Sequence, residues 1–284
     1  MDAILLCMKK KGIRFFSKIT FPNTIVFKTY ERNSFLKLLR SRKQFFDNVL
    51  IMAHGANNAI LTTSRDPNKC YTTYIEKKDA DAFKNNFVFA VSCLTANEFG
   101  KCCVAEKGCI AYLGYQVEIG CLFCAGPGPK SNTPGSVITA VNTIVKHIFV
   151  SELSKSFEVF LKTPVSVQVL RQRFAFELEK RLSELLDMDA DQVYSQYQIR
   201  IRERHYKAFA VDMILEVLSQ LDNILPKLIC IGDDNYISSS FIRYRIADGF
   251  SSSQISAELN SNPFFQRLAH TEYKKFLKDY AASF

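Results

Sequence analysis

The chain has 284 residues, of which 48% are hydrophobic and 23% are charged, and its formal net charge at pH 7 is +9. This balance excludes a disordered or fibrous protein, and the length suits one large domain or a domain with an appended lobe. The positive charge permits an acidic partner without requiring one. No stretch is apolar for long enough to span a membrane, and the opening apolar run is too short for a signal peptide. We therefore expect a cytoplasmic protein whose nine cysteines are reduced.

The first part of the chain alternates short apolar runs, typical of buried strands, with helical stretches. This alternation indicates parallel strands joined by right-handed helical crossovers. A hairpin is expected over residues 58–74, with its turn at Asp66-Pro67-Asn68. The expected strands cover residues 3–8, 24–30, 46–53, 87–93 and 109–115. The expected helices cover residues 33–42, 77–84 and 96–107.

Beyond a loop rich in Gly and Pro at residues 126–135, the pattern becomes mainly helical. The sequence therefore predicts an α/β fold, in which a mostly parallel sheet flanked by helices occupies residues 1–130. Residues 131–284 are expected to form a helical extension that packs on this core or continues it. The helices expected there cover residues 136–153, 164–188, 190–223 and 236–284.

Two reactive side chains, His54 and Cys93, stand at the ends of expected buried strands. In an open parallel sheet, chemistry gathers beyond the carboxyl ends of the strands. The hairpin and the short helix between the two residues form a connection that lets their strands lie side by side. We therefore expect the imidazole of His54 to reach the thiol of Cys93.

A thiol beside an imidazole is the arrangement that a cysteine nucleophile needs. The pKa of a free thiol is about 8.5 and the thiolate is the nucleophile, so a neighbouring imidazole takes the proton. Gly55 has no Cβ, so its backbone can approach a ligand closely and offer an N–H to a developing oxyanion. The N–H of Cys93 supplies a second donor. The sequence thus predicts His54 and Cys93 as catalytic residues, with an oxyanion hole formed by the backbone of Gly55 and Cys93.

Three segments support this assignment by their order and spacing: IMAHG at 51–55, FVFAVSCLTAN at 87–97 and GCIAYLGYQ at 108–116. Together they resemble the caspase-like cysteine peptidases, most closely the bacterial CHAT class. The resemblance covers about residues 46–120. It implies a caspase-like sheet, a dyad of His54 and Cys93, and hydrolysis of a peptide bond through an acyl-enzyme, with no metal or cofactor. It also implies a protein substrate, an activating or sensor protein, and a role in bacterial defence or programmed death.

The segment around the expected nucleophile departs from that of some relatives. The sequence Val91-Ser-Cys-Leu-Thr95 lacks the Gln-Ala-Cys-Arg-Gly of the mammalian type. Val91 stands where relatives that cleave after Lys or Arg often carry Asp, so the sequence gives no support to a preference for basic residues. An acidic group in the pocket remains possible from Glu98, Glu118 or a later loop.

Two other interpretations concern the same residues and the remaining cysteines. His54 as a core histidine and Cys93 as an inert buried thiol would leave a catalytically silent, caspase-like interaction module. Zinc is not favoured, because the Cys121–Cys124 pair has no second pair at ligand spacing. The remaining cysteines in this region, Cys102, Cys103 and Cys109, are expected to be small apolar packing residues.

The C-terminal part offers a further alternative, a DNA-binding regulator. Residues 244–260 resemble a helix-turn-helix, with a Gly at the turn and a Ser that caps the next helix. The presumed second helix has no Arg or Lys, so we do not expect nucleic acid as a partner. The basic stretch at 199–204 is interpreted as a solvated surface that alternatively docks an acidic partner.

Overall fold

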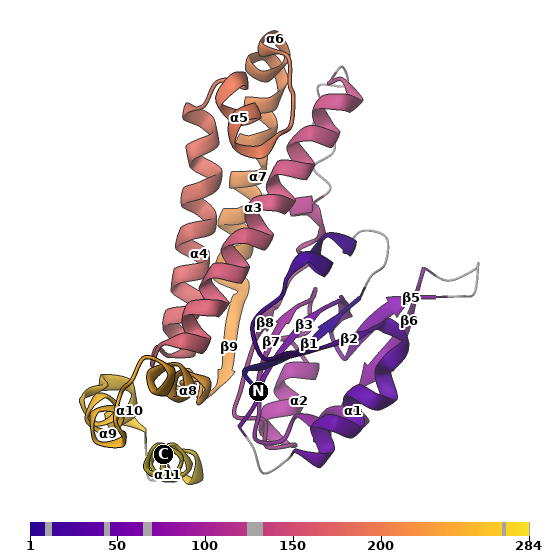
Figure 1. Cartoon of the computed structure of the whole chain (residues 1–284). Helices are drawn as coiled ribbons and strands as arrows, with labels where there is room; N and C mark the ends of the chain where they lie inside the picture. The colour runs from indigo at the N-terminus through magenta and orange to yellow at the C-terminus, as the bar shows by residue number, and fades with distance from the viewer. Residues whose placement is uncertain (9–12, 43–45, 65–69, 124–132, 269–270, 284) are drawn as a thin grey trace.

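A six-stranded sheet covered by helices on both faces forms the centre of the protein in the computed structural model (Figure 1). The predicted α/β class, with a mostly parallel sheet and C-terminal helices, is confirmed, and the arrangement is consistent with a caspase-like α/β fold. The structure describes residues 1–8, 13–42, 46–64, 70–123, 133–268 and 271–283.

The sheet has the strand order β2-β1-β3-β7-β8-β9. Its first five strands are parallel, and β9 pairs antiparallel with β8. The five strands expected from the sequence are confirmed, with ends that differ by no more than two residues. Four of them are buried along their whole length, so their apolar runs are nearly continuous, whereas the strand at 24–28 is partly exposed at the edge of the sheet. The strands are β1 (Ala3–Cys7), β2 (Thr24–Lys28), β3 (Asn48–Met52), β7 (Phe87–Val91), β8 (Ala111–Tyr115) and β9 (Leu228–Gly232).

A small antiparallel sheet lies between β3 and β7 in the chain. It consists of β4 (His54–Ala56), β5 (Ala59–Thr63) and β6 (Tyr71–Glu76), in that order. The antiparallel pairing of β5 with β6 confirms the predicted hairpin, whose expected turn at 66–68 lies outside the described residues.

One face of the large sheet is covered by α1 (Arg32–Ser41), the 3-10 helix η3 (Lys77–Phe83) and α2 (Phe99–Ala105). Phe99 joins this layer to the sheet, because its ring packs 6.1 Å from that of Tyr112 in β8 and 6.2 Å from that of Phe83. These elements correspond to the three helices expected in this part of the chain.

The other face is covered by α3 (Gly135–Lys162) and α4 (Val167–Ser183). Phe87 and Phe89 of β7 pack against this layer, with ring centroids 5.1 Å from Phe160 and 6.2 Å from Phe174. By length and composition α3 is the one described helix apolar enough to cross a membrane, yet half of its most apolar stretch is buried inside the protein. That burial is typical of a core helix in a soluble protein.

The chain beyond residue 130 is not entirely helical, because β9 completes the sheet. The apolar run at 228–232 is too short to show a helical or an alternating pattern. It becomes a strand because it pairs with the backbone of β8 at the end of the sheet. The single helix expected over 190–223 is also divided into separate helices. The predicted loop at 126–135 lies mostly outside the described residues, and α3 begins at Gly135.

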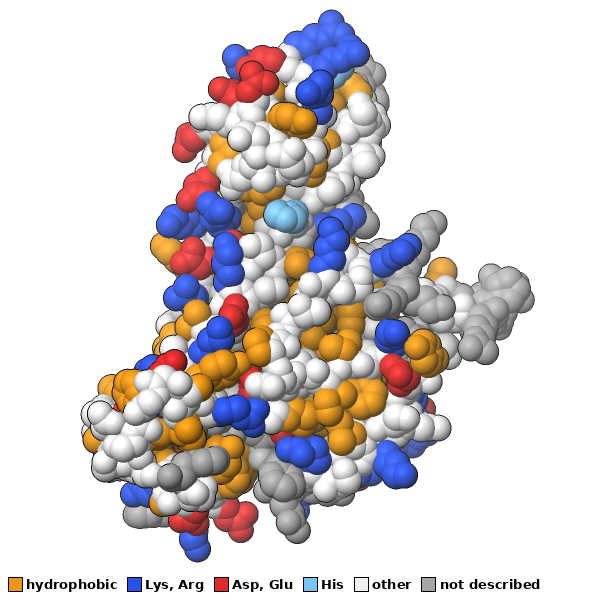
Figure 2. All heavy atoms as spheres, viewed as in Figure 1, with side chains coloured by type: hydrophobic (Ala, Val, Ile, Leu, Met, Phe, Trp, Pro, Cys, Tyr) orange, Lys and Arg blue, Asp and Glu red, His pale blue; other side chains and the backbone are white. Residues whose placement is uncertain are grey.

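The remaining helices gather at the two ends of the molecule (Figure 1), which project from its middle in the space-filling view from the same side (Figure 2). α5 (Ala190–Tyr197), α6 (Glu203–His205) and α7 (Val211–Ile224) lie around the ends of α3 and α4 that extend past the sheet. At the opposite end lie α8 (Ser240–Ala247), α9 (Ser252–Ser261), α10 (Pro263–Arg267) and α11 (Glu272–Ala282). The other short helical segments are η1 (Arg14–Lys18), η2 (Thr29–Glu31), η4 (Gly120–Phe123), η5 (Glu184–Asp187), the π-helical η6 (Tyr206–Ala210) and η7 (Leu225–Lys227).

Buried polar contacts attach the C-terminal helices to the amino ends of the strands. The side-chain amide of Asn48 in β3 donates to the Ser238 hydroxyl at 2.8 Å and to the Asp2 carbonyl oxygen at 2.8 Å. The Asp2 carboxylate, which is buried, pairs with Arg243 at 2.9 Å and accepts from Tyr244 at 2.7 Å. The C-terminal helices therefore contact the end of the sheet at which the strands begin. The carboxyl ends of the strands lie at the other end of the sheet.

Candidate active site

The pairing of β3 with β7 brings His54 and Cys93 to the same edge of the sheet. Met52 lies opposite Val91 in this parallel pair, and the Ala53 N–H donates to the Val91 carbonyl at 3.4 Å. His54 and Cys93 each follow this matched pair by two residues in the sequence. The expectation that the two strands are neighbours is confirmed.

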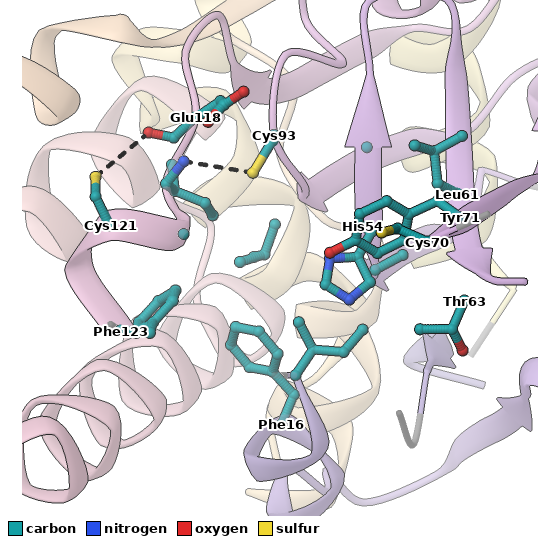
Figure 3. A pocket seen from close by; sticks show the side chains of 16 residues that line it. Phe16, His54, Leu61, Thr63, Cys70, Tyr71, Cys93, Glu118, Cys121 and Phe123 are labelled. Carbon is teal, nitrogen blue, oxygen red and sulfur yellow. Dashed lines mark hydrogen bonds between the residues drawn. The ribbon is translucent and has the colours of Figure 1, made fainter. Parts of the chain in front are cut away.

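A pocket of about 630 Å³ opens at this edge, and His54, Gly55 and Cys93 all line it (Figure 3). The Cys93 side chain is partly buried and its sulfur points toward the pocket wall formed by the Glu118–Cys121 segment. The His54 ring lies on the other side of the opening. The structure thus brings together the three residues that the sequence assigned to catalysis and oxyanion binding.

Gly55 lies in close contact with the turn that carries Cys93. A Cβ at this position would collide with the carbonyl oxygen of Cys93 and with the hydroxyl of Ser92. The next turn of the chain is fastened to the same region, because the Asn57 carbonyl accepts from the N–H groups of Glu98 (3.0 Å) and Phe99 (2.7 Å) at the start of α2. Only a residue without a side chain lets the β4 strand approach Cys93 so closely.

The turn after Cys93 has an uncommon backbone conformation. Leu94 has a φ of 61°, in the left-handed region that non-glycine residues rarely adopt. Hydrogen bonds hold the turn there, since Leu94 N–H donates to the Val117 carbonyl at 3.2 Å and Ala96 N–H donates to the Tyr115 carbonyl at 3.1 Å. Backbone of this kind persists where the surroundings over-determine it, and it is concentrated at functional sites.

The Cys93 sulfur accepts a hydrogen bond from the Ile119 N–H at 3.4 Å. Burial raises the pKa of the Cys93 thiol above its ordinary value, and this effect exceeds the opposing one of the Ile119 and Gly120 N–H groups. The nearby Glu118 raises the pKa further. The thiol is therefore protonated at neutral pH in this state, and a nucleophilic role requires a base beside it.

His54 is the titratable base in the same pocket. It begins β4, opposite Leu61 of β5, and its ring centroid lies 4.5 Å from that of Tyr71 in β6. Its Nε2 atom is shielded from solvent. The small antiparallel sheet thus holds the imidazole between a tyrosine ring and the opening of the pocket (Figure 3).

The backbone donors expected for an oxyanion are also at the pocket. β4 is the edge strand of its sheet, and Gly55 lies one position before Ala56, which closes the hairpin with Ala59. Hydrogen-bonded and open pairs alternate in antiparallel strands, so the Gly55 N–H points away from β5. Within the described part of the chain, the Cys93 N–H donates to no backbone carbonyl. Both N–H groups are therefore positioned to donate hydrogen bonds to a ligand oxygen.

Of the two candidate acidic residues, Glu118 lines the pocket and Glu98 does not. Glu98 instead forms an ion pair with Lys77 at 2.6 Å on the surface. Among the cysteines considered for zinc, Cys102, Cys103 and Cys109 are buried, Cys121 lines the pocket and Cys124 lies outside the described residues. The described residues hold no group of three potential metal ligands.

Sequence reasoning missed the rest of the pocket. Ile13 and Phe16 follow β1, Tyr71 begins β6, and Phe123 ends η4, so these lining residues come from distant parts of the chain. No short motif marks them. The signal available was positional, because residues 13–16 and 119–123 follow strands β1 and β8, whose carboxyl ends flank those of β3 and β7.

No protein-family model matches this chain, and no curated protein matches it in sequence.

The raised pKa of Cys93 predicts slow alkylation by iodoacetamide. At pH 7 Cys93 should react at least about tenfold more slowly than the exposed Cys70 and Cys121, because its thiolate is scarce and shielded. The rate at Cys93 should rise steeply at more alkaline pH. Peptide mass spectrometry measures the rates, and a Cys93→Ala variant assigns the peptide. Fastest alkylation at Cys93 at pH 7 would contradict this description of the thiol.

The close packing of Gly55 predicts that Gly55→Ala lowers the free energy of unfolding by about 2 kcal/mol. The added methyl group must displace either β4 or the Cys93 turn. Gly135→Ala is the matched control, because a Cβ there would meet nothing within 4 Å, and its effect should be below about 0.5 kcal/mol. Urea unfolding of both variants measures the difference, and equal stabilities would refute the close contact.

Proposed function

We propose that this protein is a cysteine peptidase in which Cys93 is the nucleophile and His54 is the general base and acid. One observation carries the proposal: two neighbouring parallel strands end at one pocket of about 630 Å³ that His54, Gly55 and Cys93 all line. The resemblance of residues 46–120 to the caspase-like peptidases gives the same assignment from the sequence.

In the first chemical step, Cys93 Sγ bonds to the carbonyl carbon of the scissile peptide while the thiol proton passes to the His54 imidazole. The N–H groups of Gly55 and Cys93 stabilise the resulting oxyanion. His54 then gives its proton to the leaving amine, the C–N bond breaks, and the acyl group stays on sulfur as a thioester. Water attacks the thioester as His54 takes its proton, and the released Cys93 sulfur regains that proton from His54.

The state of the thiol supports activation by a partner protein. Burial raises the pKa of Cys93, and the sulfur is bonded to the Ile119 N–H, on the side of the pocket away from His54 (Figure 3). A partner that shifts residues 117–123 would release the sulfur toward the imidazole. The bacterial CHAT resemblance extends this proposal to a cytoplasmic peptidase of a defence or programmed-death system that cleaves a specific protein.

The same thiol favours one alternative, a catalytically silent interaction module. A protonated, hydrogen-bonded thiol is compatible with a purely structural Cys93. The two functions differ in their response to Cys93→Ala, since a module keeps its partner binding and its cellular effect, whereas a peptidase loses its effect.

The helix pair at the C-terminus gives no support to DNA binding. α8 and α9 follow one another in the chain, with Ser251 capping α9. However, Glu258 is the only charged residue of α9, and it pairs with Arg245 at 2.5 Å. A helix without basic side chains has no cation to neutralise phosphates, so nucleic acid is not part of the proposal.

Cleavage of a proteome extract tests the peptidase. The full chain, with and without the products of neighbouring genes, should generate new N-termini that mass spectrometry detects. Cys93→Ala and His54→Ala should each lower the yield at least about 10³-fold, because each removes a group that the reaction needs. Cys102→Ala, which removes a thiol from α2 outside the pocket, should keep full activity. New termini that persist in Cys93→Ala, or that never form, would reject the peptidase.

A further inference from the structure

The pocket beside Cys93 has an apolar side that the chemistry described above does not use. We call it the apolar recess and define it as Phe16, Ala53, Val91, Ile119 and Phe123, all of which line the pocket. Each of these five residues is less than 5% exposed. Figure 3 shows the rings of Phe16 and Phe123 bordering the same opening as the Cys93 sulfur and the His54 ring. A group bound at the dyad therefore has an apolar wall within reach.

The walls of the recess are held by the core of the protein. Phe16 and Phe123 pack edge to face, with ring centroids 6.1 Å apart. Both rings also pack on Phe149 of α3, at 5.9 Å and 4.9 Å. Rings fixed by three mutual contacts do not need to rearrange when a ligand binds, and such preformed recesses discriminate by size and polarity.

Charge is placed away from the recess. Among the described residues that line the pocket, Glu118 is the only Asp, Glu, Lys or Arg, and it is exposed. In Figure 3 the Glu118 side chain projects on the side of Cys93 away from Phe16 and Phe123. No lysine or arginine belongs to the described lining, so a buried acidic side chain would find no counter-charge there.

We propose that the recess binds a large apolar side chain, such as Leu, Met or Phe, of the substrate residue whose carbonyl carbon Cys93 attacks. This inference rests on the proposed function and names its substrate class. An acidic residue at that position would lose hydration against five apolar side chains and find no counter-charge in the described lining. A basic residue would find Glu118 only at the exposed rim, where an ion pair contributes little.

The first test is the cleavage profile of the full chain on a peptide library made from a digested proteome. Leu, Met and Phe together should exceed Lys and Arg, and also Asp and Glu, at least about tenfold before the cleaved bond. A profile dominated by charged residues would overturn the inference while leaving the peptidase intact.

The second test does not depend on catalysis, and it separates the two proposals. The Cys93→Ala variant is mixed with acetylated tetrapeptide amides that have three randomised positions and a fixed last residue, Leu, Lys or Asp. Saturation-transfer NMR should show binding of the Leu set at least about tenfold stronger than the others. If the library is not cleaved but the Leu set binds preferentially, the peptidase fails and the recess stands. Equal binding of the three sets would overturn the inference that the recess binds an apolar side chain.

Two variants identify the side chains that are responsible. Phe123→Leu enlarges the recess and should shift the preferred residue toward Phe and Tyr at least about threefold relative to Leu. Glu118→Gln is the matched control at the exposed rim, and it should leave the ranking of residues unchanged. A changed order of preferred residues in Glu118→Gln would show that the carboxylate, and not the recess, selects the substrate. Thermal unfolding confirms that each variant is folded.

Discussion

The parallel pairing of β3 with β7, with Met52 opposite Val91, is the constraint on which the candidate site depends. A single backbone ladder of five residue pairs fixes this register, and both strands are buried along their whole length. Because a parallel pair aligns its carboxyl ends, the residues that follow leave the sheet together. The imidazole of His54 and the thiol of Cys93, which are far apart in the sequence, thereby line the same pocket.

A second constraint sets how closely the two turns approach. The missing side chain of Gly55 lets β4 lie against the Cys93 carbonyl, and the Asn57 carbonyl accepts from the first N–H groups of α2. The hairpin that carries His54 is thus fastened to the segment that carries Cys93. The same packing buries the thiol and raises its pKa, so the contacts that assemble the site also keep its nucleophile protonated.

The parts of the fold that could be predicted are those whose signal is local. Runs such as Phe87–Val91 are apolar, short and followed by turns. The reactive residues just after two of these runs, His54 and Cys93, indicated the site. β9 was missed because Leu228–Gly232 has no periodicity of its own and becomes a strand only against β8. The apolar recess was missed for a related reason, since Phe16 and Phe123 meet only after α3 packs both rings on Phe149.

Cooperation of His54 with Cys93 is measured by the rate at which an active-site label modifies the thiol. The full chain, with and without the products of neighbouring genes, is incubated with a peptidyl acyloxymethyl ketone that carries Leu next to the reactive group, and the intact mass and modified residue are followed over time. We expect a single thioether on Cys93, and its rate of formation should fall at least about 100-fold in His54→Ala. An unchanged rate in His54→Ala, or modification of the exposed Cys70 and Cys121 in preference to Cys93, would contradict it.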